Sequence, residues 1–231
     1  IKIGIIGIIG DDAISVAPSA APVTFDDPIK SAKKTVKILI EKENPDLIIC
    51  LSHSGIYPTE DGKSFYGEDI DLAEKVPEID IIISGHTHVE TNEPIKINDT
   101  YIVQTGSYAY NTGKIELKIE NGKITKFDFI LIPVDDKIKG DEKIQKMIDD
   151  HIEFIDNKYL KETGLSYNTK VAKLNYDIKT DYIKLKSSNM GNFVADADKY
   201  YLENNGVEID FSMVASGTIR EDLVKGTKGI I

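Results

Sequence analysis

The chain has 231 residues, of which 41% are hydrophobic, and it carries a formal net charge of −11 at pH 7. This negative charge argues against a nucleic-acid-binding protein, because such proteins rely on Lys and Arg at phosphate groups. No apolar run is long enough to form a transmembrane helix, and the single cysteine, Cys50, excludes an intrachain disulfide and is expected in a buried strand.

The first part of the chain alternates strand and helix signals. The expected elements are a strand at 1–8, a loop rich in Ala, Pro and Ser at 11–24, a helix at 28–43, a strand at 46–51, a helix at 68–76 and a strand at 79–83. Pro28 suits the first helical position, and Asn44-Pro45 stops the helix. Because strands that alternate with helices form βαβ units, we expect parallel strands around residues 46–83.

The pattern after residue 94 favours strands, with antiparallel pairing expected after residue 100. The expected elements are a strand at 100–105, a hairpin of strands 114–120 and 123–132 around Asn121-Gly122, an amphipathic helix at 141–163, a strand at 170–176, a helix at 189–203 and a strand at 209–214. This order predicts a first domain at 1–134, a linker helix within 135–165 and a smaller α/β unit at 166–231.

Three of the four histidines follow expected strands. Gly85-His86-Thr87-His88 comes after the strand at 79–83, and His53 comes after the strand at 46–51. Ligands gather outside the carboxyl ends of strands in open α/β sheets, and imidazole is a common ligand of first-row metals. The pattern therefore predicts a metal site. The alternative is a set of loop histidines that only cap or hydrogen-bond, and His151 is expected on a solvated helix face.

Several runs of the sequence resemble a known family. The runs Leu51–Gly55, Ser84–His88 and Val103–Ser107 resemble the second half of a calcineurin-like metallophosphoesterase domain. The runs Asn189–Ala197 and Ser216–Arg220 resemble the start of the carboxy-terminal domain of 5′-nucleotidases. The resemblance covers almost the whole chain. It implies an α/β (α+β) fold: the second half of a metallophosphoesterase β-sandwich with flanking helices, a linker helix, and the first part of a smaller α/β domain.

The resemblance also implies a function. The family hydrolyses phosphoesters such as nucleoside monophosphates with two divalent metal ions, of the Zn, Mn, Fe or Co class. By resemblance, His53 and His86 ligate one ion and His88 the other. Arg220, the only arginine of the chain, matches a family arginine that binds the substrate phosphate, and Lys184 lies where the family has another such arginine. Lysine keeps the charge but loses the bidentate fork.

The chain also departs from the family pattern. Three family motifs have no counterpart in the runs that resemble the family: Asp-x-His, Gly-Asp-x-x-Asp with the bridging aspartate, and Asn-His-Glu/Asp with the catalytic histidine. The one Asp-x-His of the chain, Asp149–His151, lies in the helix expected at 141–163. Ser187 and Ala215 replace residues that are often Glu and Asn. We therefore expect a fragment whose catalytic histidine lies upstream of Ile1, with a partial or empty metal site, an unpaired sheet edge and no activity by itself. A longer parent protein or a complementing chain would supply the rest.

Alternatives to the nucleotidase activity remain at this stage. One is a non-catalytic binding or structural module on the same scaffold, favoured by the changes at Lys184, Ser187 and Ala215. Another is a cyclic-nucleotide phosphodiesterase or a UDP-sugar hydrolase. The resemblance favours an extracellular, cell-surface or periplasmic location, and a nucleotide as the substrate partner.

Overall fold

The computed structural model describes residues 1–120, 122–180, 187–219 and 222–225. The chain divides into two compact units, Ile1–Lys139 and Gly140–Ile231. The helix expected as a linker falls within the second unit. The division into two domains and a separate linker stays a prediction.

A five-stranded sheet with the order β1-β2-β5-β7-β6 forms the centre of the first unit. Its strands are β1 (Ile3–Ile9), β2 (Leu47–His53), β5 (Ile81–Ile83), β6 (Ile95–Ile97) and β7 (Thr100–Val103). The pairs β1–β2, β2–β5 and β5–β7 are parallel, and β6–β7 is antiparallel. The expectation of parallel strands around the histidines is confirmed.

The expectation that all pairing after residue 100 is antiparallel was wrong, because β7 runs parallel to β5. The sequence analysis missed β6, which takes the chain back along the sheet. The turn at Asn98, with φ of +54°, then leads into β7. A three-residue strand such as β6 carries too little alternation to be recognised from sequence.

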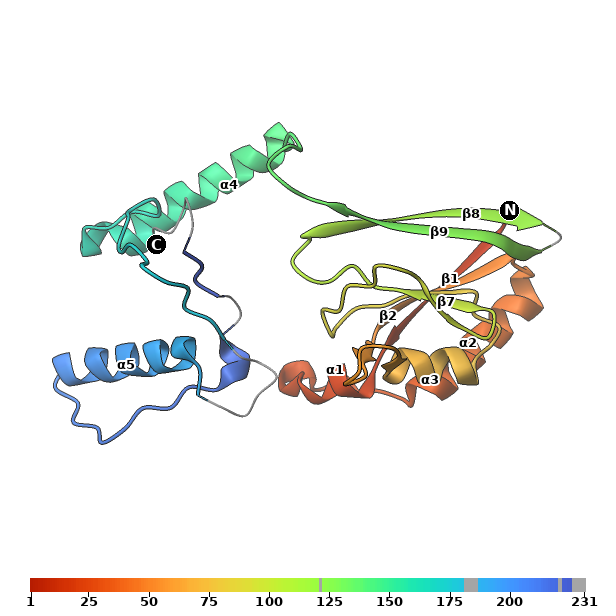
Figure 1. Ribbon diagram of the computed structural model, residues 1–231, viewed down its shortest axis with the longest axis horizontal. Helices are drawn as coiled ribbons and strands as arrows, with labels where there is room; N and C mark the ends of the chain where they lie inside the picture. The colour runs from red at the N-terminus through yellow and green to blue at the C-terminus, as the bar shows by residue number, and fades with distance from the viewer. Residues whose placement is uncertain (121, 181–186, 220–221, 226–231) are drawn as a thin grey trace. The chain divides into compact units, whose positions relative to one another are not determined.

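Two helices, α2 (Pro28–Glu43) and α3 (Glu68–Lys75), cover one face of this sheet, and α1 (Asp11–Ser15) continues from the end of β1 (Figure 1). The Asp27 carboxylate caps α2 by accepting from the Lys30 N–H, and Asn44 ends it in the left-handed conformation. The expected loop at 11–24 contains α1 and a 3₁₀ turn at Pro18–Ala20. A contact from distant Glu68 caps α1, so local sequence did not reveal this helix.

The hydrophobic core lies between the sheet and these helices. Its fully buried members include residues of β2, β5, β7, α2 and α3: Ala32, Val36, Ile48, Cys50, Leu72, Ala73, Ile82 and Ile102. The alternation of buried and exposed residues along β1 and β2 points one side of each strand into this core. The core therefore fixes the register of the strands that end at the histidines.

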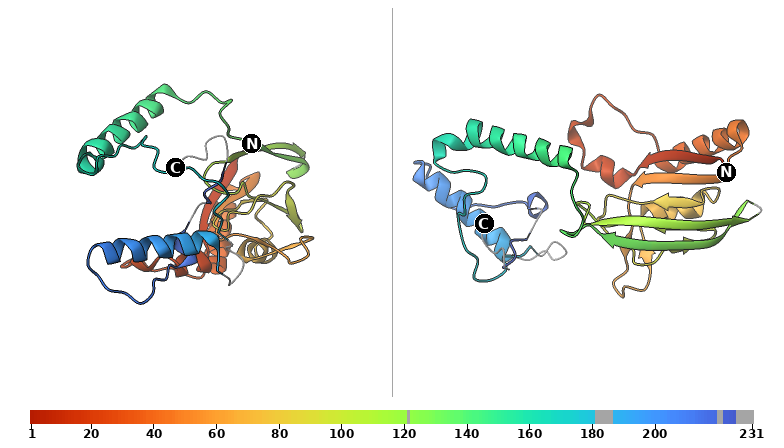
Figure 2. Two further views of the ribbon diagram at one scale, coloured as in Figure 1. Left: turned by 60° about the vertical axis from the view of Figure 1, so that its left-hand side comes forward. Right: turned by 90° about the horizontal axis from the view of Figure 1, so that it is seen from above.

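A long hairpin packs on the opposite face of the sheet (Figure 1). It consists of β8 (Asn111–Glu120) and β9 (Lys123–Pro133), as the sequence predicted. The ring of Phe127 stacks on Tyr101 with centroids 4.1 Å apart. The view from above in Figure 2 shows β1 clear of the hairpin, and Ile3 and Ile5 are 50% and 61% exposed. Within the described residues, β1 forms one edge of the sheet, with β2 as its only strand neighbour.

Two smaller groups of elements complete the description. In the first unit, β3 (Tyr57–Pro58) pairs with β4 (Phe65–Tyr66). The second unit contains α4 (Glu142–Ile155), a π-helical turn at Asp156–Leu160, 3₁₀ turns at Lys161–Thr163 and Ser216–Thr218, and α5 (Asn189–Asn204). None of the helices in the described ranges is long and apolar enough to cross a membrane.

The strands expected at 170–176 and 209–214 do not form. A strand needs a neighbour to satisfy its backbone groups, and neither segment pairs with a strand in the part of the chain that the structure describes. Lys173 takes part in a single bridge, and Ile178, just after the first segment, forms another with Leu223. The apolar side chains of Phe211 and Met213, 71% and 82% exposed, remain outside any core. The helices predicted at 141–163 and 189–203 are confirmed.

Cys50 provides a first test of this core. It is fully buried in β2, as predicted, and burial together with the charge of Asp69 raises the pKa of its thiol to about 12. Only the thiolate reacts rapidly with disulfide reagents, so the thiol stays protonated and unreactive below that pH. We expect Ellman's reagent to label the native chain negligibly at pH 8 and stoichiometrically after unfolding in guanidinium. Rapid stoichiometric labelling without denaturant would contradict the burial of β2.

Candidate functional site

The carboxyl ends of β2 and β5 bring two of the predicted histidines together. His53 is the last residue of β2, and His86 lies three residues beyond the end of β5. Because β2 and β5 are parallel neighbours, their carboxyl ends share one edge of the sheet. The ring centroids of His53 and His86 are 5.0 Å apart, and the ring planes are tilted by 59°. The position of the pair agrees with the expectation for ligand sites in α/β sheets.

The backbone at both histidines of the Gly-His-Thr-His turn is unusual. His86 has φ of +75° and His88 has φ of +59°. Residues with side chains seldom occupy this left-handed region, and they persist there only where the surroundings hold them. Such conformations cluster at functional sites, so the turn is a candidate site on backbone geometry alone.

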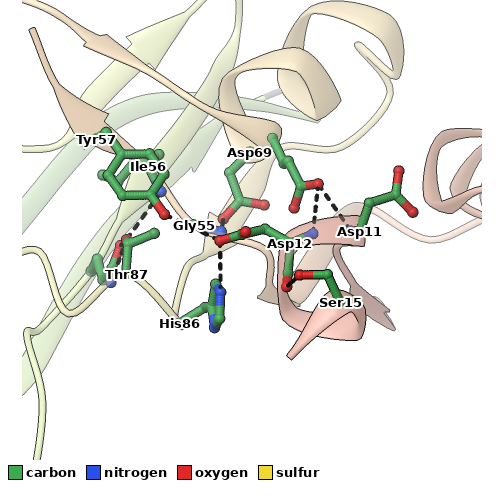
Figure 3. A network of polar contacts seen from close by, with 11 residues as sticks. Asp11, Asp12, Ser15, Gly55, Ile56, Tyr57, Asp69, His86 and Thr87 are labelled. Carbon is green, nitrogen blue, oxygen red and sulfur yellow. Dashed lines mark hydrogen bonds and ion pairs between the residues drawn. The ribbon is translucent and has the colours of Figure 1, made fainter. Parts of the chain in front are cut away.

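Asp12 adds a carboxylate to the pair of histidines, and the sequence analysis missed it. Its Oδ2 lies 3.0 Å from Nε2 of His86 and accepts a hydrogen bond from the Tyr57 hydroxyl at 3.2 Å. Figure 3 shows the carboxylate between the tyrosine hydroxyl and the imidazole. Burial, and then the charge of Asp12, raise the pKa of Tyr57. The signal available in the sequence was its place: Asp12 follows β1 and so belongs to the same edge of the sheet.

Glu68 fixes the helix that carries Asp12. Its Oε1 accepts from the N–H groups of Asp11 and Asp12 at 2.9 Å and 3.2 Å, which satisfies two free donors at the start of α1. The other oxygen, Oε2, is buried and has no hydrogen-bond partner among the described residues. A Cβ at Gly10 would lie 1.9 Å from this oxygen and 2.8 Å from the backbone Cα of Ser54, so only glycine fits there.

His88 makes a different contact. Its ring meets the edge of Tyr108 with centroids 5.4 Å apart, and Tyr108 in turn contacts Tyr110 at 6.1 Å. Tyr108 and Ala109 also have positive φ, of +55° and +56°. The loop after β7 therefore joins the same edge of the sheet through His88.

The side chains at this end of the strands include groups of the kinds that bind metal ions. Two imidazoles and one carboxylate are donors that first-row divalent ions accept. Within the described ranges, no group of three or more His, Cys, Asp or Glu side chains is arranged to hold an ion. His53, His86 and Asp12 thus fit a metal by chemistry, and further donors are needed to close the coordination shell.

The other residues singled out from the sequence lie elsewhere. Lys184 and Arg220 lie outside the described residues. Ser187 comes just before Ser188, whose side chain caps α5, and Ala215 precedes the short turn at Ser216–Thr218. His151 is exposed on α4, as expected, with its Nδ1 2.9 Å from the Met147 carbonyl oxygen.

Comparison with known proteins agrees with this geometry. Residues 10–90 match the family model of calcineurin-like phosphoesterases. The chain is 25% identical over 201 residues to the trifunctional nucleotide phosphoesterase protein YfkN of Bacillus subtilis, covering 84% of this chain and 13% of that protein. It is 27% identical over 266 residues to the 5′-nucleotidase of Vibrio vulnificus, covering 98% of this chain and 46% of that protein. The chain thus spans less than half of these relatives.

A solved structure with the same fold covers nearly all of the chain. The 5′-nucleotidase precursor from Thermus thermophilus superposes with a TM-score of 0.70 at 19% identity, over 99% of this chain and 45% of that one. At this identity the likeness shows the fold. The mixed α/β architecture expected from the sequence is therefore confirmed.

Proposed function

Because residues 10–90 match the calcineurin-like phosphoesterase family, we propose that the chain works as part of a metal-dependent phosphoester hydrolase of the 5′-nucleotidase type. The reaction is hydrolysis of a nucleoside monophosphate to a nucleoside and phosphate. The observation that carries the proposal is the facing pair of His53 and His86 at the carboxyl ends of β2 and β5. The names of the Bacillus and Vibrio relatives, a nucleotide phosphoesterase and a 5′-nucleotidase, support the substrate class.

Calcineurin-like phosphoesterases use divalent metals, and we propose that the histidines of this chain hold them. His53 and His86 bind one ion, and His88 binds the other. When bound, such a pair clamps the phosphoryl group and lowers the pKa of a coordinated water. Asp12 accepts a hydrogen bond from Nε2 of His86 in the structure described here, and it keeps that ring oriented until the ion is bound.

Substrate binding is proposed for the second unit. Arg220 would hold the substrate phosphate, because a guanidinium offers two parallel donors to phosphate oxygens. Lys184 would add a second positive charge. These two roles rest on the resemblance of the sequence, since both residues lie outside the described ranges.

The remaining ligands are proposed to come from polypeptide outside these 231 residues. The three missing motifs carry the bridging aspartate and the catalytic histidine of the family, and the runs that resemble the family contain none of them. The chain spans 46% of the Vibrio relative, so that protein has room for them. A longer parent or a complementing chain would complete the site. By family resemblance, the complete enzyme is proposed to act in the periplasm, at the cell surface or outside the cell.

A complementation assay tests this proposal. Phosphate release from AMP is measured with Mn²⁺ for this chain alone, and for this chain together with polypeptide that carries the three missing motifs, either from its own gene or from the Vibrio relative. Circular dichroism and gel filtration confirm that each sample is folded and assembled. We expect background rates for the chain alone and turnover that EDTA abolishes for the complemented sample.

Two outcomes contradict parts of this proposal. Chelator-sensitive turnover by the purified chain alone would show that its own carboxylates complete the metal site. A folded, complemented sample that hydrolyses neither AMP, nor a cyclic nucleotide, nor a UDP-sugar would favour the non-catalytic binding module. Turnover of a cyclic nucleotide or UDP-sugar in preference to AMP would correct the substrate class while keeping the chemistry.

A further inference from the structure

A set of buried and partly buried polar side chains lies beneath the histidine turns. Its members come from the ends of β2, β5 and β7 and from α3: Ser52, Ser54, Asp69, Ser84, Thr87 and Gln104. Asp69 and Gln104 are 0% and 1% exposed. A buried carboxylate or amide is costly unless its hydrogen bonds are made. The contacts of these two side chains are therefore informative.

Asp69 joins the ends of β2 and β5. Its Oδ1 accepts from the Ser52 hydroxyl at 2.5 Å, and its Oδ2 accepts from the Ser84 hydroxyl at 2.6 Å. Oδ2 also accepts from the backbone N–H of Gly55 at 3.0 Å. Ser52 directly precedes His53, and Ser84 lies two residues before His86. One carboxylate thus holds the backbone next to both facing histidines.

Gln104 holds the Gly-His-Thr-His turn from the end of β7. With its amide oriented to match its neighbours, Oε1 accepts from the N–H groups of His88 and Val89 at 3.0 Å and 3.1 Å. Its Nε2 donates to the hydroxyls of Ser84 and Thr87 at 3.1 Å and 3.2 Å. Ser84 therefore connects Asp69 to Gln104, and the network spans three strand ends.

We propose that Asp69 and Gln104 are positioning residues, which hold His53, His86 and His88 in the geometry needed to bind metal. The need for such a clamp follows from the backbone, because His86 and His88 both occupy the left-handed region. Hydrogen bonds to the flanking hydroxyls and to the His88 N–H offset the cost of that conformation. The metal-binding purpose rests on the proposed function, whereas the positioning itself rests on the contacts.

The chain offers a matched control at the opposite ends of these strands. Asp80 is partly buried, and its Oδ2 accepts from the backbone N–H of Ile48 at 2.7 Å, near the amino ends of β2 and β5. Asp80→Asn therefore changes a carboxylate that joins the same two strands, but at the end of the strands that is far from the histidines. Gln104→Leu removes the hydrogen bonds of the amide to all four residues at similar side-chain size, and Gln104→Glu keeps an acceptor for His88 and Val89.

Hydrogen exchange and histidine NMR on this full chain test the positioning directly. For Gln104→Leu we expect the His88 and Val89 amides to exchange about tenfold faster or more, and the ring nitrogen signals of His86 and His88 to shift. Gln104→Glu restores most of the amide protection. Asp69→Asn is expected to affect the Gly55 amide and the ring of His53. Two references are used. The ring signals of His151 should not shift in any of these variants, and Asp80→Asn should leave the exchange rates and ring signals of the Gly-His-Thr-His turn unchanged.

Unchanged exchange and unchanged ring signals in both Gln104→Leu and Asp69→Asn would overturn the proposal. So would a uniform rise in exchange across the sheet, since that indicates a loss of global stability. In the complemented hydrolase, the metal concentration for half-maximal activity should rise about 10- to 100-fold, with the KM for AMP unchanged. If no hydrolysis occurs at all, the proposed function fails, and the NMR result still decides the positioning role.

Discussion

His86→Ala is expected to lower phosphate release by the complemented hydrolase by more than about a hundredfold, because it removes a proposed metal ligand. The ring lies next to that of His53 and contacts the carboxylate of Asp12, at the place where the ion is proposed to bind. The side chain of His86 is only 17% exposed. Alanine, like histidine, has a Cβ, so the substitution does not relieve the left-handed backbone at this position as glycine would. The rate is measured with AMP at saturating Mn²⁺.

His151→Ala is the matched control for this prediction. It is the same substitution at an exposed histidine, whose ring contacts the carbonyl of Met147 on its own helix. Its activity is expected to stay within about twofold of the unsubstituted protein. Equal losses in both variants would indicate damage to the fold, and full activity of a folded His86→Ala variant would remove His86 from the proposed site.

Ile82→Ala is expected to destabilise the first unit by about 2–5 kcal/mol. Ile82 is fully buried in β5, the middle strand of the sheet, and belongs to the core between the sheet and its helices. The substitution leaves a cavity that a close-packed core fills only partly. Urea unfolding followed by circular dichroism measures the change.

Ile130→Ala is the control for the core prediction. Ile130 lies on β9 and is 52% exposed, so its truncation is expected to cost less than about 1 kcal/mol. A smaller loss of stability for Ile82→Ala than for Ile130→Ala would contradict the arrangement of the sheet.

Local signals explain what the sequence predicted well. The helix at 28–43 has Asp27, Pro28 and Asn44 at its boundaries, and the hairpin of β8 and β9 has alternating side chains around Asn121-Gly122. The histidines at the strand ends were recognisable because buried parallel strands are continuous apolar runs. These features depend on residues that are close together in the sequence.

Tertiary contacts explain what the sequence could not predict. The short helix α1 depends on Glu68, more than fifty residues away. Asp69 and Gln104 look like ordinary helix and strand-end residues until α3 and β7 place them beneath the histidines. The strands expected at 170–176 and 209–214 had the right composition, but strand formation also requires a neighbour. Contacts between segments far apart in the sequence decided each of these cases.

Metal location in the complemented protein is the measurement that tests the central claim most directly. Crystals are grown with Zn²⁺, and anomalous diffraction at the zinc edge locates the ions. We expect a peak with ring nitrogens of His53 and His86 at about 2.1 Å, and a second peak bound by His88. Zinc bound elsewhere, with His86 still turned toward Asp12 and both His53 and His86 free of metal, would contradict the proposed role of these strand ends.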